Sequence, residues 1–136
     1  MTNFKEINFL QNSDMPIGYQ VYEKRISIAD LQIYRGQALS FCKGGKKRLQ
    51  FIRDKENKLD KNAIAVTGFS KGFLSKEKEF FLGYIPRDIA RKIVGAGLEN
   101  EVIPRLERIY LGNKVFLDIA FQLIGKAENK DKYQNA

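Results

Sequence analysis

The stretch that decides the fold is residues 53–66, which read RDKENKLDKNAIAV. Its first part consists, apart from Leu59, of charged and amide side chains, and its last part is small, branched and apolar. Asn and Asp side chains accept hydrogen bonds from nearby backbone amides and thereby stabilise tight turns. We therefore predict an ordered loop, held by Asn57, Asp60 and Asn62, that leads into a central strand over residues 63–67.

Further strand-like runs lie on both sides of this loop, over residues 26–31, 48–53, 80–85, 106–110 and 115–123. The last run is the clearest, because every second residue is a large apolar one, as in a half-buried strand. These residues are Val115, Leu117, Ile119, Phe121 and Leu123. Gly112-Asn113 is a two-residue linker of the hairpin type and predicts antiparallel pairing with residues 106–110.

One helix is predicted after Pro86, which suits the first helical position, and it should end at Gly95 or Gly97. Ile89, Ile93 and Val94 would then face the sheet, with Arg87, Arg91 and Lys92 pointing outward. The expected fold is a mostly-β, six-stranded antiparallel barrel with one or two short helices, similar to the oligonucleotide-binding barrel.

The 136 residues suit one domain. We predict an N-terminal extension over residues 1–25, with a short strand or helical turn around Gly18 to Glu23. A folded domain follows over residues 26–125, and then a polar, frayed tail over residues 126–136.

The net charge of +8 points to a polyanionic partner. Residues 26–125 hold 18 basic and 11 acidic side chains, so +7 of this charge belongs to the predicted domain. Nucleic acid is the most common polyanion inside cells, although lysines that only maintain solubility would give the same total. The loop over residues 43–48, KGGKKR, is compatible with a plain turn and with backbone phosphate contacts.

The composition argues against an enzyme, a metal site and a bound cofactor. The chain has no histidine and one cysteine, Cys42, and it contains neither GxxxxGK[ST] nor GxGxxG. The only close carboxylates, Asp54, Glu56 and Asp60, alternate with lysines, which is typical of a solvated loop. The longest apolar stretch, residues 115–124, is far short of the ~20 residues of a spanning helix. We therefore expect a soluble, cytoplasmic, non-catalytic protein with no membrane partner.

Residues 53–66 and the later LGYIP at residues 82–86 occur in an order that resembles the HIRAN domain family. The centre of that family runs R-[DE]-x-x-N-x-x-D-x-N-A-I-x-V, followed by G-[YH]-[IL]-[PK] and a short helix. The resemblance covers residues 26–125 and is closest to members that occur alone in bacterial and phage proteins.

The resemblance implies a modified oligonucleotide-binding barrel that grips single-stranded DNA at its 3′ end, with a DNA-processing protein as a further partner. In the family a polar and aromatic stretch on the first strand stacks the terminal bases, and the motif aspartate bonds the terminal hydroxyl or base. These positions correspond to Gln32, Ile33 and Tyr34, and to Leu59 and Asp60. The predicted nucleic-acid-binding residues are Gln32, Tyr34, Arg35, Lys46, Lys47, Arg53, Leu59 and Asp60.

The sequence departs from the family pattern at three of these positions. The best-known members have Arg-Tyr-Tyr where this chain has Gln32-Ile33-Tyr34, and an aromatic residue where it has Leu59. A base stacked on an aromatic ring contributes about 1–3 kcal/mol, so the loss of two rings weakens binding substantially. The alternative is therefore a protein-interaction or structural module that kept the barrel and lost the DNA-end pocket.

Overall fold

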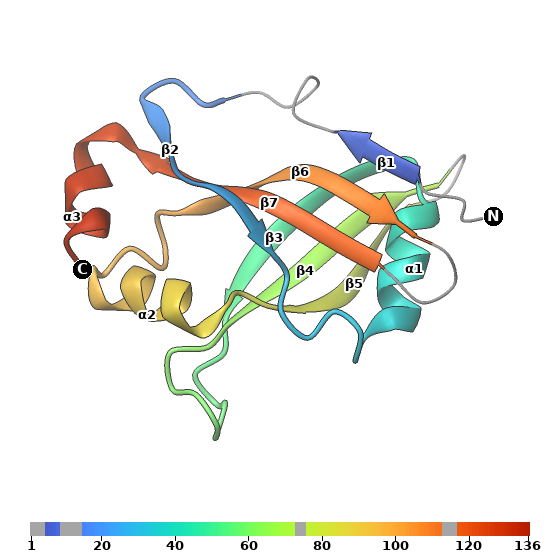
Figure 1. Ribbon diagram of the computed structural model, residues 1–136, viewed down its shortest axis with the longest axis horizontal. Helices are drawn as coiled ribbons and strands as arrows, with labels where there is room; N and C mark the ends of the chain where they lie inside the picture. The colour runs from blue at the N-terminus through green and yellow to red at the C-terminus, as the bar shows by residue number, and fades with distance from the viewer. Residues whose placement is uncertain (1–4, 9–14, 73–75, 113–116) are drawn as a thin grey trace.

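The computed structural model describes residues 5–8, 15–72, 76–112 and 117–136. In chain order the elements are β1 (Lys5–Asn8), β2 (Tyr19–Ser27), α1 (Arg35–Lys43), β3 (Lys46–Arg53), β4 (Ile64–Lys71), β5 (Glu77–Tyr84), α2 (Arg87–Gly95), β6 (Ile103–Leu111), β7 (Leu117–Lys126), a 3-10 turn η2 (Ala127–Asn129) and α3 (Lys130–Gln134). The expected mostly-β, antiparallel fold is confirmed (Figure 1).

The described strands form two antiparallel sheets, with the order β1-β6-β7-β2 in one and β3-β4-β5 in the other. The sheets are joined at one corner, where the chain leaves β2. There Ala29 and Tyr84 exchange two backbone hydrogen bonds of 2.8 and 3.0 Å. The predicted barrel is thus built from a four-stranded and a three-stranded sheet linked by one bridge, and the described strands include β1 as a seventh strand.

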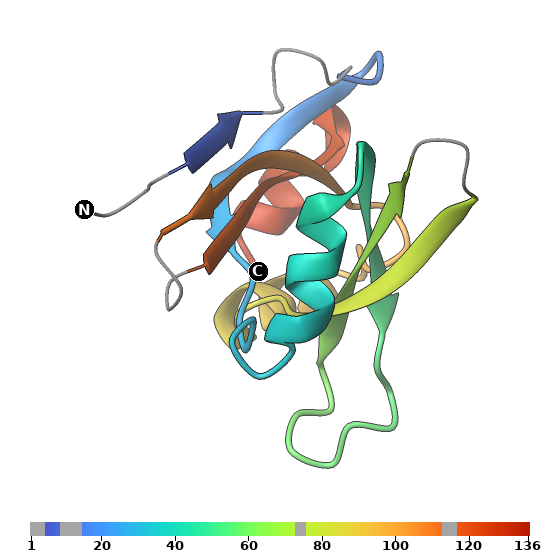
Figure 2. The same ribbon diagram turned by 90° about the vertical axis from the view of Figure 1, so that its right-hand side faces the viewer.

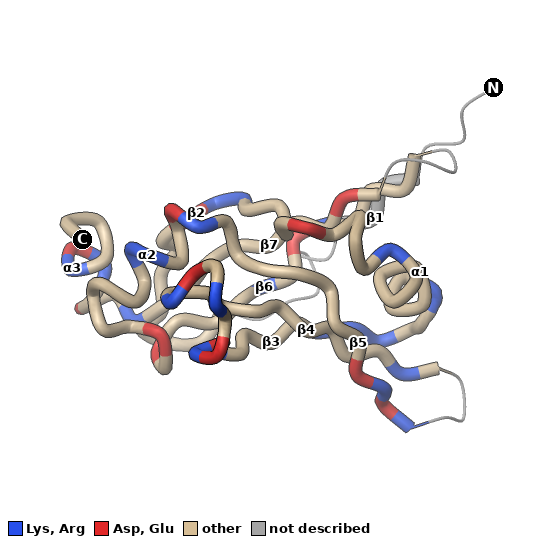
Figure 3. The backbone as a smooth tube through the Cα atoms, turned by 90° about the horizontal axis from the view of Figure 1, so that it is seen from below, with Lys and Arg blue, Asp and Glu red and all other residues tan. Residues whose placement is uncertain are grey.

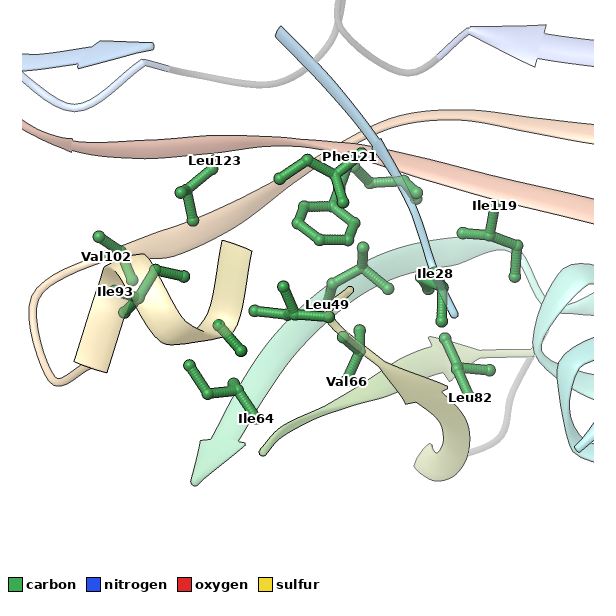
Figure 4. Close-up of a cluster of buried hydrophobic side chains, with 14 of the residues drawn as sticks. Ile28, Leu49, Ile64, Val66, Leu82, Ile93, Val102, Ile119, Phe121 and Leu123 are labelled. Atoms are coloured by element: carbon green, nitrogen blue, oxygen red, sulfur yellow. The ribbon is translucent and has the colours of Figure 1, made fainter. Parts of the chain in front are cut away.

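The hydrophobic core lies between the two sheets and is closed at one end by α2 (Figure 4). Leu117, Ile119, Phe121 and Leu123 of β7 are each at most 2% exposed, which confirms the period-two prediction for the described part of this strand. Val115 and Asn113, which belonged to the same prediction, lie outside the described residues.

The predicted first strand over residues 26–31 is shifted in the structure. Strand β2 starts at Tyr19, ends at Ser27 and is followed by a turn. Asp30 has a φ of 64°, a left-handed conformation that interrupts an extended chain, and Ile33 N donates to Asp30 O at 3.0 Å. Gln32 and Tyr34 therefore lie on a turn that leads into a helix, and the expectation of a strand there is wrong.

Helix α1 was not predicted, so the described residues contain three α-helices where one or two were expected. Its buried residues, Ala38 and Phe41, are three positions apart, a spacing that could have revealed it. Gly36 and Ser40, both poor helix formers, weaken that pattern. The predicted helix after Pro86 is confirmed as α2, with Ala90 and Ile93 fully buried.

Both ends of the chain hold secondary structure. Strand β1 pairs with β6, and β2 pairs with β7, so of the short strand or helical turn expected around Gly18 to Glu23 the structure has the strand. The prediction of a frayed C-terminal tail is wrong. Tyr133 of α3 is fully buried and stacks on Tyr22 with ring centroids 5.2 Å apart. Domain limits at residues 26 and 125 stay a prediction. None of the described helices is long and apolar enough to cross a membrane.

Candidate nucleic-acid interface

A groove of about 480 Å³ lies where three segments of the chain meet. These are the motif loop between β3 and β4, the turn after β2, and the junction of β5 with α2. In Figure 2 the motif loop projects from the ends of β3 and β4, in green at the bottom of the view. The groove is lined by Ala29, Asp30, Ile33, Tyr34, Asn57, Leu59, Asp60, Ala63, Tyr84, Ile85 and Arg87.

The side chains of Asn57 and Asp60 hold the motif loop in shape, as predicted, whereas Asn62 contributes its backbone amide. Asn57 Oδ1 accepts hydrogen bonds from the backbone amides of Leu59 at 2.9 Å and Asp60 at 3.0 Å. Asp60 Oδ1 accepts one from the amide of Asn62 at 2.9 Å. These bonds fix the loop from within and present Leu59 and Asp60 toward the groove.

The second carboxylate oxygen of Asp60 faces Arg87, the first residue of α2. Arg87 Nε lies 4.0 Å from Asp60 Oδ2, and Arg87 Nη2 donates to Leu59 O at 3.5 Å. The Asp60 side chain is 20% exposed and that of Arg87 is 74% exposed. Such an exposed pair is weak, so the guanidinium can turn to another anion without a large penalty.

Tyr34 and Tyr84 provide the aromatic surface of the groove. Both rings pack edge-on against Phe81, with ring centroids 4.6 Å and 5.6 Å away respectively. Tyr84 donates a hydrogen bond to Asp54 Oδ2 at 3.1 Å, and burial together with this carboxylate raises the pKa of Tyr84. The three rings support one another, which holds Tyr34 in place for contact with a planar ligand.

Ile33 and Leu59, the two positions at which the sequence lacks an aromatic ring, both line the groove. They are 73% and 86% exposed, which is unusual for large aliphatic side chains. Both side chains are thus open to solvent at the groove. The structure therefore places Ile33, Tyr34, Leu59 and Asp60 together, as the motif positions predicted.

The model of the HIRAN domain family matches residues 22–127. The chain belongs to the HIRAN domain family. HIRAN domains are known as DNA-binding modules. A crystal structure of the HIRAN domain of human HLTF is similar at a TM-score of 0.46 and 19% sequence identity, covering 89% of this chain and 94% of that one. No curated protein matches the chain.

Several residues that the sequence analysis assigned to the site lie beside the groove of this HIRAN domain or away from it. Gln32 Nε2 donates to Leu117 O and Gln32 Oε1 accepts from Arg35 Nη1, each at 3.0 Å, so Gln32 is directed toward the start of β7 and Arg35 toward Gln32. Arg53 Nη1 donates to Ala63 O at 3.2 Å and closes the base of the motif loop.

Lys46 and Lys47 lie at the opposite end of β3 from the motif loop. Lys46 pairs with Lys71 in the ladder, whereas Arg53, at the loop end, pairs with Ile64. Lys47 Nζ donates to Gly44 O and to Gly45 O, which fits a plain turn over residues 43–48. Seen from below, basic and acidic segments are interspersed, and the motif loop carries both signs (Figure 3).

Arg87 is, with Asp30 and Tyr84, among the residues of the HIRAN groove that the sequence did not reveal. The prediction that Arg87 lies on the outer face of α2 agrees with its exposed side chain. This side chain is directed to the motif loop, which ends 24 residues earlier in the chain. The available signal was the position directly after the GYIP segment. Asp30 and Tyr84 were missed for the same reason, since only the tertiary fold brings them to the motif loop.

The acidic and thiol side chains of the described residues are further candidate reactive groups. They contain no group of three or more His, Cys, Asp or Glu side chains that could hold a metal ion. Asp54, the first acid of the motif loop, is engaged by Tyr84 and by Asn57 Nδ2 at 3.4 Å. Burial raises the pKa of the Cys42 thiol to about 11, so it is a poor nucleophile at neutral pH.

Proposed function

We propose that this HIRAN domain grips single-stranded DNA at its 3′ end and carries out no chemistry on it. The observation that carries the proposal is that Tyr34, Asp60 and Arg87 converge on one groove. A strand end presents a base, a terminal hydroxyl and a backbone phosphate close together. An aromatic ring, a carboxylate and a guanidinium are the side chains that bind these three groups.

In this arrangement the terminal base stacks on Tyr34 and the terminal hydroxyl donates a hydrogen bond to Asp60 Oδ2. Asp60 Oδ1 is already used by the Asn62 amide, so the outer oxygen is the one that can accept from a ligand. Arg87 then moves from Asp60 to the phosphate that precedes the terminal nucleotide. Ile33 and Leu59 contact the base and sugar on either side.

The proposed site spans two to four nucleotides and therefore neutralises few phosphates. Counterion release predicts a slope of log affinity against log salt of roughly −0.7 per phosphate, or about −1.5 to −3 overall. Affinity should be modest, because Ile33 and Leu59 provide less stacking than the rings they replace.

Fluorescence anisotropy with 5′-labelled oligonucleotides tests the proposal directly. The strands end in a 3′ hydroxyl or in a 2′,3′-dideoxy nucleotide, and titrations are repeated at several salt concentrations. We expect tighter binding of the hydroxyl end, and Asp60→Asn should abolish this preference while leaving most of the salt slope. Tyr34→Ala should cost about 1–3 kcal/mol for both strands.

Arg87→Ala and Arg91→Ala form a matched pair of variants, because both arginines are on α2, one turn apart, and carry the same charge. Arg87→Ala should flatten the salt slope by about 0.7, whereas Arg91→Ala should have a smaller effect. If wild-type protein binds no strand at low salt, the DNA proposal is wrong.

The exposed aliphatic side chains of the groove favour a second candidate, a protein-interaction module. Ile33 and Leu59 are large apolar groups in contact with solvent, as at many docking sites. This candidate predicts that Ile33→Ser and Leu59→Ser leave DNA titrations unchanged but abolish co-purification of a protein partner.

A further inference from the structure

Asp30 stands out in the wall of the groove because of its backbone conformation. Its φ of 64° is the one left-handed conformation of a non-glycine residue in the part of the chain that the structure describes. Glycine adopts this conformation without a steric penalty, and aspartate tolerates it less well. A strained backbone at a groove is a reason to ask what the side chain contributes there.

The carboxylate of Asp30 is available to a ligand. It is exposed, and no hydrogen bond or ion pair involves it within the described ranges. Asp60, the other carboxylate of the groove, is engaged by the Asn62 amide and faces Arg87. The backbone of Asp30 shapes the turn that lines the groove, but its carboxylate makes no bond to a described residue that would hold the groove together.

The charged residues that line the groove are negative in sum, whereas the whole chain is positive. The residues that line the groove include two acidic ones, Asp30 and Asp60, and one basic one, Arg87, so their formal charges sum to −1. The chain as a whole carries +8. A groove that bound phosphate groups at every position would not be expected to carry an excess of acid.

We propose that Asp30 is a specificity-determining residue that rejects strand ends carrying a terminal phosphate and so restricts the groove to ends with a free hydroxyl. The inference rests on the proposed function. A terminal phosphate monoester carries a charge of about −1.5 to −2 at pH 7, whereas a hydroxyl is neutral. Two nearby carboxylates repel the phosphate, and Arg87 can compensate only one of them.

The role differs from that of Asp60, which accepts a hydrogen bond from the hydroxyl. Loss of the Asp60 carboxylate lowers the affinity for a strand with a hydroxyl end, whereas loss of the Asp30 carboxylate raises the affinity for a strand with a phosphorylated end. Three strands that differ only in their 3′ terminus separate the two effects. The ratio of the affinities for the hydroxyl and dideoxy strands measures the contribution of the hydrogen bond. The ratio of the affinities for the hydroxyl and phosphate strands measures the effect of the terminal charge.

The test uses anisotropy titrations of the full chain with these three strands at low salt. Asp30→Asn should increase affinity for the 3′-phosphate strand about five- to tenfold and change affinity for the 3′-hydroxyl strand less than twofold. Asp131→Asn is the matched control, because it removes the same charge from an exposed position on α3, away from the groove. It should raise affinity for all strands equally and slightly.

Asp30→Gly removes the carboxylate at a position whose conformation suits glycine, so it should fold at least as well as the wild type. It should show the same gain for the phosphate strand. If wild type prefers the hydroxyl end but neither variant changes the ratio of hydroxyl to phosphate affinities, the role of Asp30 is wrong and the proposed function stands. If wild type binds none of the strands, the proposed function fails and this inference fails with it.

Discussion

At the scale of single residues, Gly83 lies beside the backbone bridge between Ala29 and Tyr84 that joins the two sheets. Its φ is +147°, and a Cβ built there would lie 2.2 Å from the carbonyl oxygen of Ala29. This oxygen accepts the hydrogen bond of Tyr84 N, one of the two bonds of the bridge between the sheets. A side chain at residue 83 would therefore force the bridge apart.

Gly83→Ala is expected to destabilise the protein by about 3 kcal/mol or more, because both backbone strain and the lost bridge oppose folding. Gly36→Ala is the control, since a Cβ added at this helical residue would have no atom within 4 Å. It should stabilise by about 0.5–1 kcal/mol. Urea denaturation monitored by circular dichroism gives both values, and equal stabilities of the two variants would contradict the role of Gly83.

The residue scale also shows what the sequence could and could not predict at the site. Asn57 and Asp60 were predictable because their hydrogen bonds are local, reaching amides two or three residues away. Arg87 and Asp30 were not, because their relation to the motif loop exists only in the folded chain. Gln32 bonds to Leu117 O and does not line the groove, since a family position does not say which way a side chain turns once the backbone bends at Asp30.

At the scale of elements, α3 is held by one side chain. Tyr133 is fully buried, its hydroxyl donates to Glu23 Oε1 at 3.0 Å, and the ammonium of Lys92 lies 4.3 Å from its ring centroid. Five residues do not form a stable helix alone, so packing must supply the stability. The sequence of residues 126–136 does not predict that Tyr133 is buried, because one tyrosine among ten other residues gives no periodic signal.

Tyr133→Ala should reduce stability by about 3–5 kcal/mol, through the lost burial and the cavity it leaves. Tyr133→Phe should cost only about 1 kcal/mol, because it removes the hydroxyl bond and keeps the ring. Gln134→Ala, at an exposed neighbouring position, should change stability by less than about 0.5 kcal/mol. Thermal melts check the series, and an unchanged melting temperature for Tyr133→Ala would show that α3 is dispensable.

Element types were predictable where the hydrophobic pattern has one clear period. Strand β7 and helix α2 each show such a pattern, and both were found near their predicted positions. Strand β2 contains two irregularities in its pairing with β7, between Val21 and Glu23 and between Glu23 and Ile26, which shift its side chains out of alternation. The sequence of β2 therefore shows mixed polarity and no clear period.

At the scale of the whole molecule, the titration behaviour follows from the missing histidine and the buried thiol and phenols. No side chain of ordinary pKa titrates near neutrality. Burial raises the pKa of Cys42 to about 11 and also raises the pKa values of Tyr22, Tyr84 and Tyr133. The folded state thus holds protons that the unfolded chain releases between about pH 9 and 11.

Stability should therefore be nearly constant from pH 6 to 8 and fall as the pH rises above about 9. The sign follows because folding raises these pKa values, so the folded state binds more protons than the unfolded one in the alkaline range. Melting temperatures measured between pH 6 and 10.5 test this. A step in stability between pH 6 and 8 would contradict it.

Strand β3 is an edge strand of the three-stranded sheet, since among the described strands only β4 pairs with it and its outer backbone groups have no neighbour in the ladder. Such an edge is a template on which a second molecule can add its own strand and start aggregation. Lys46 and Lys47 at its start, and Arg53 at its end, would meet like charges on an incoming copy, whereas Arg48 is paired with Glu77 at 2.9 Å. We therefore expect the two lysines far from the groove to disfavour pairing of one molecule of the protein with the next, a role that requires no ligand.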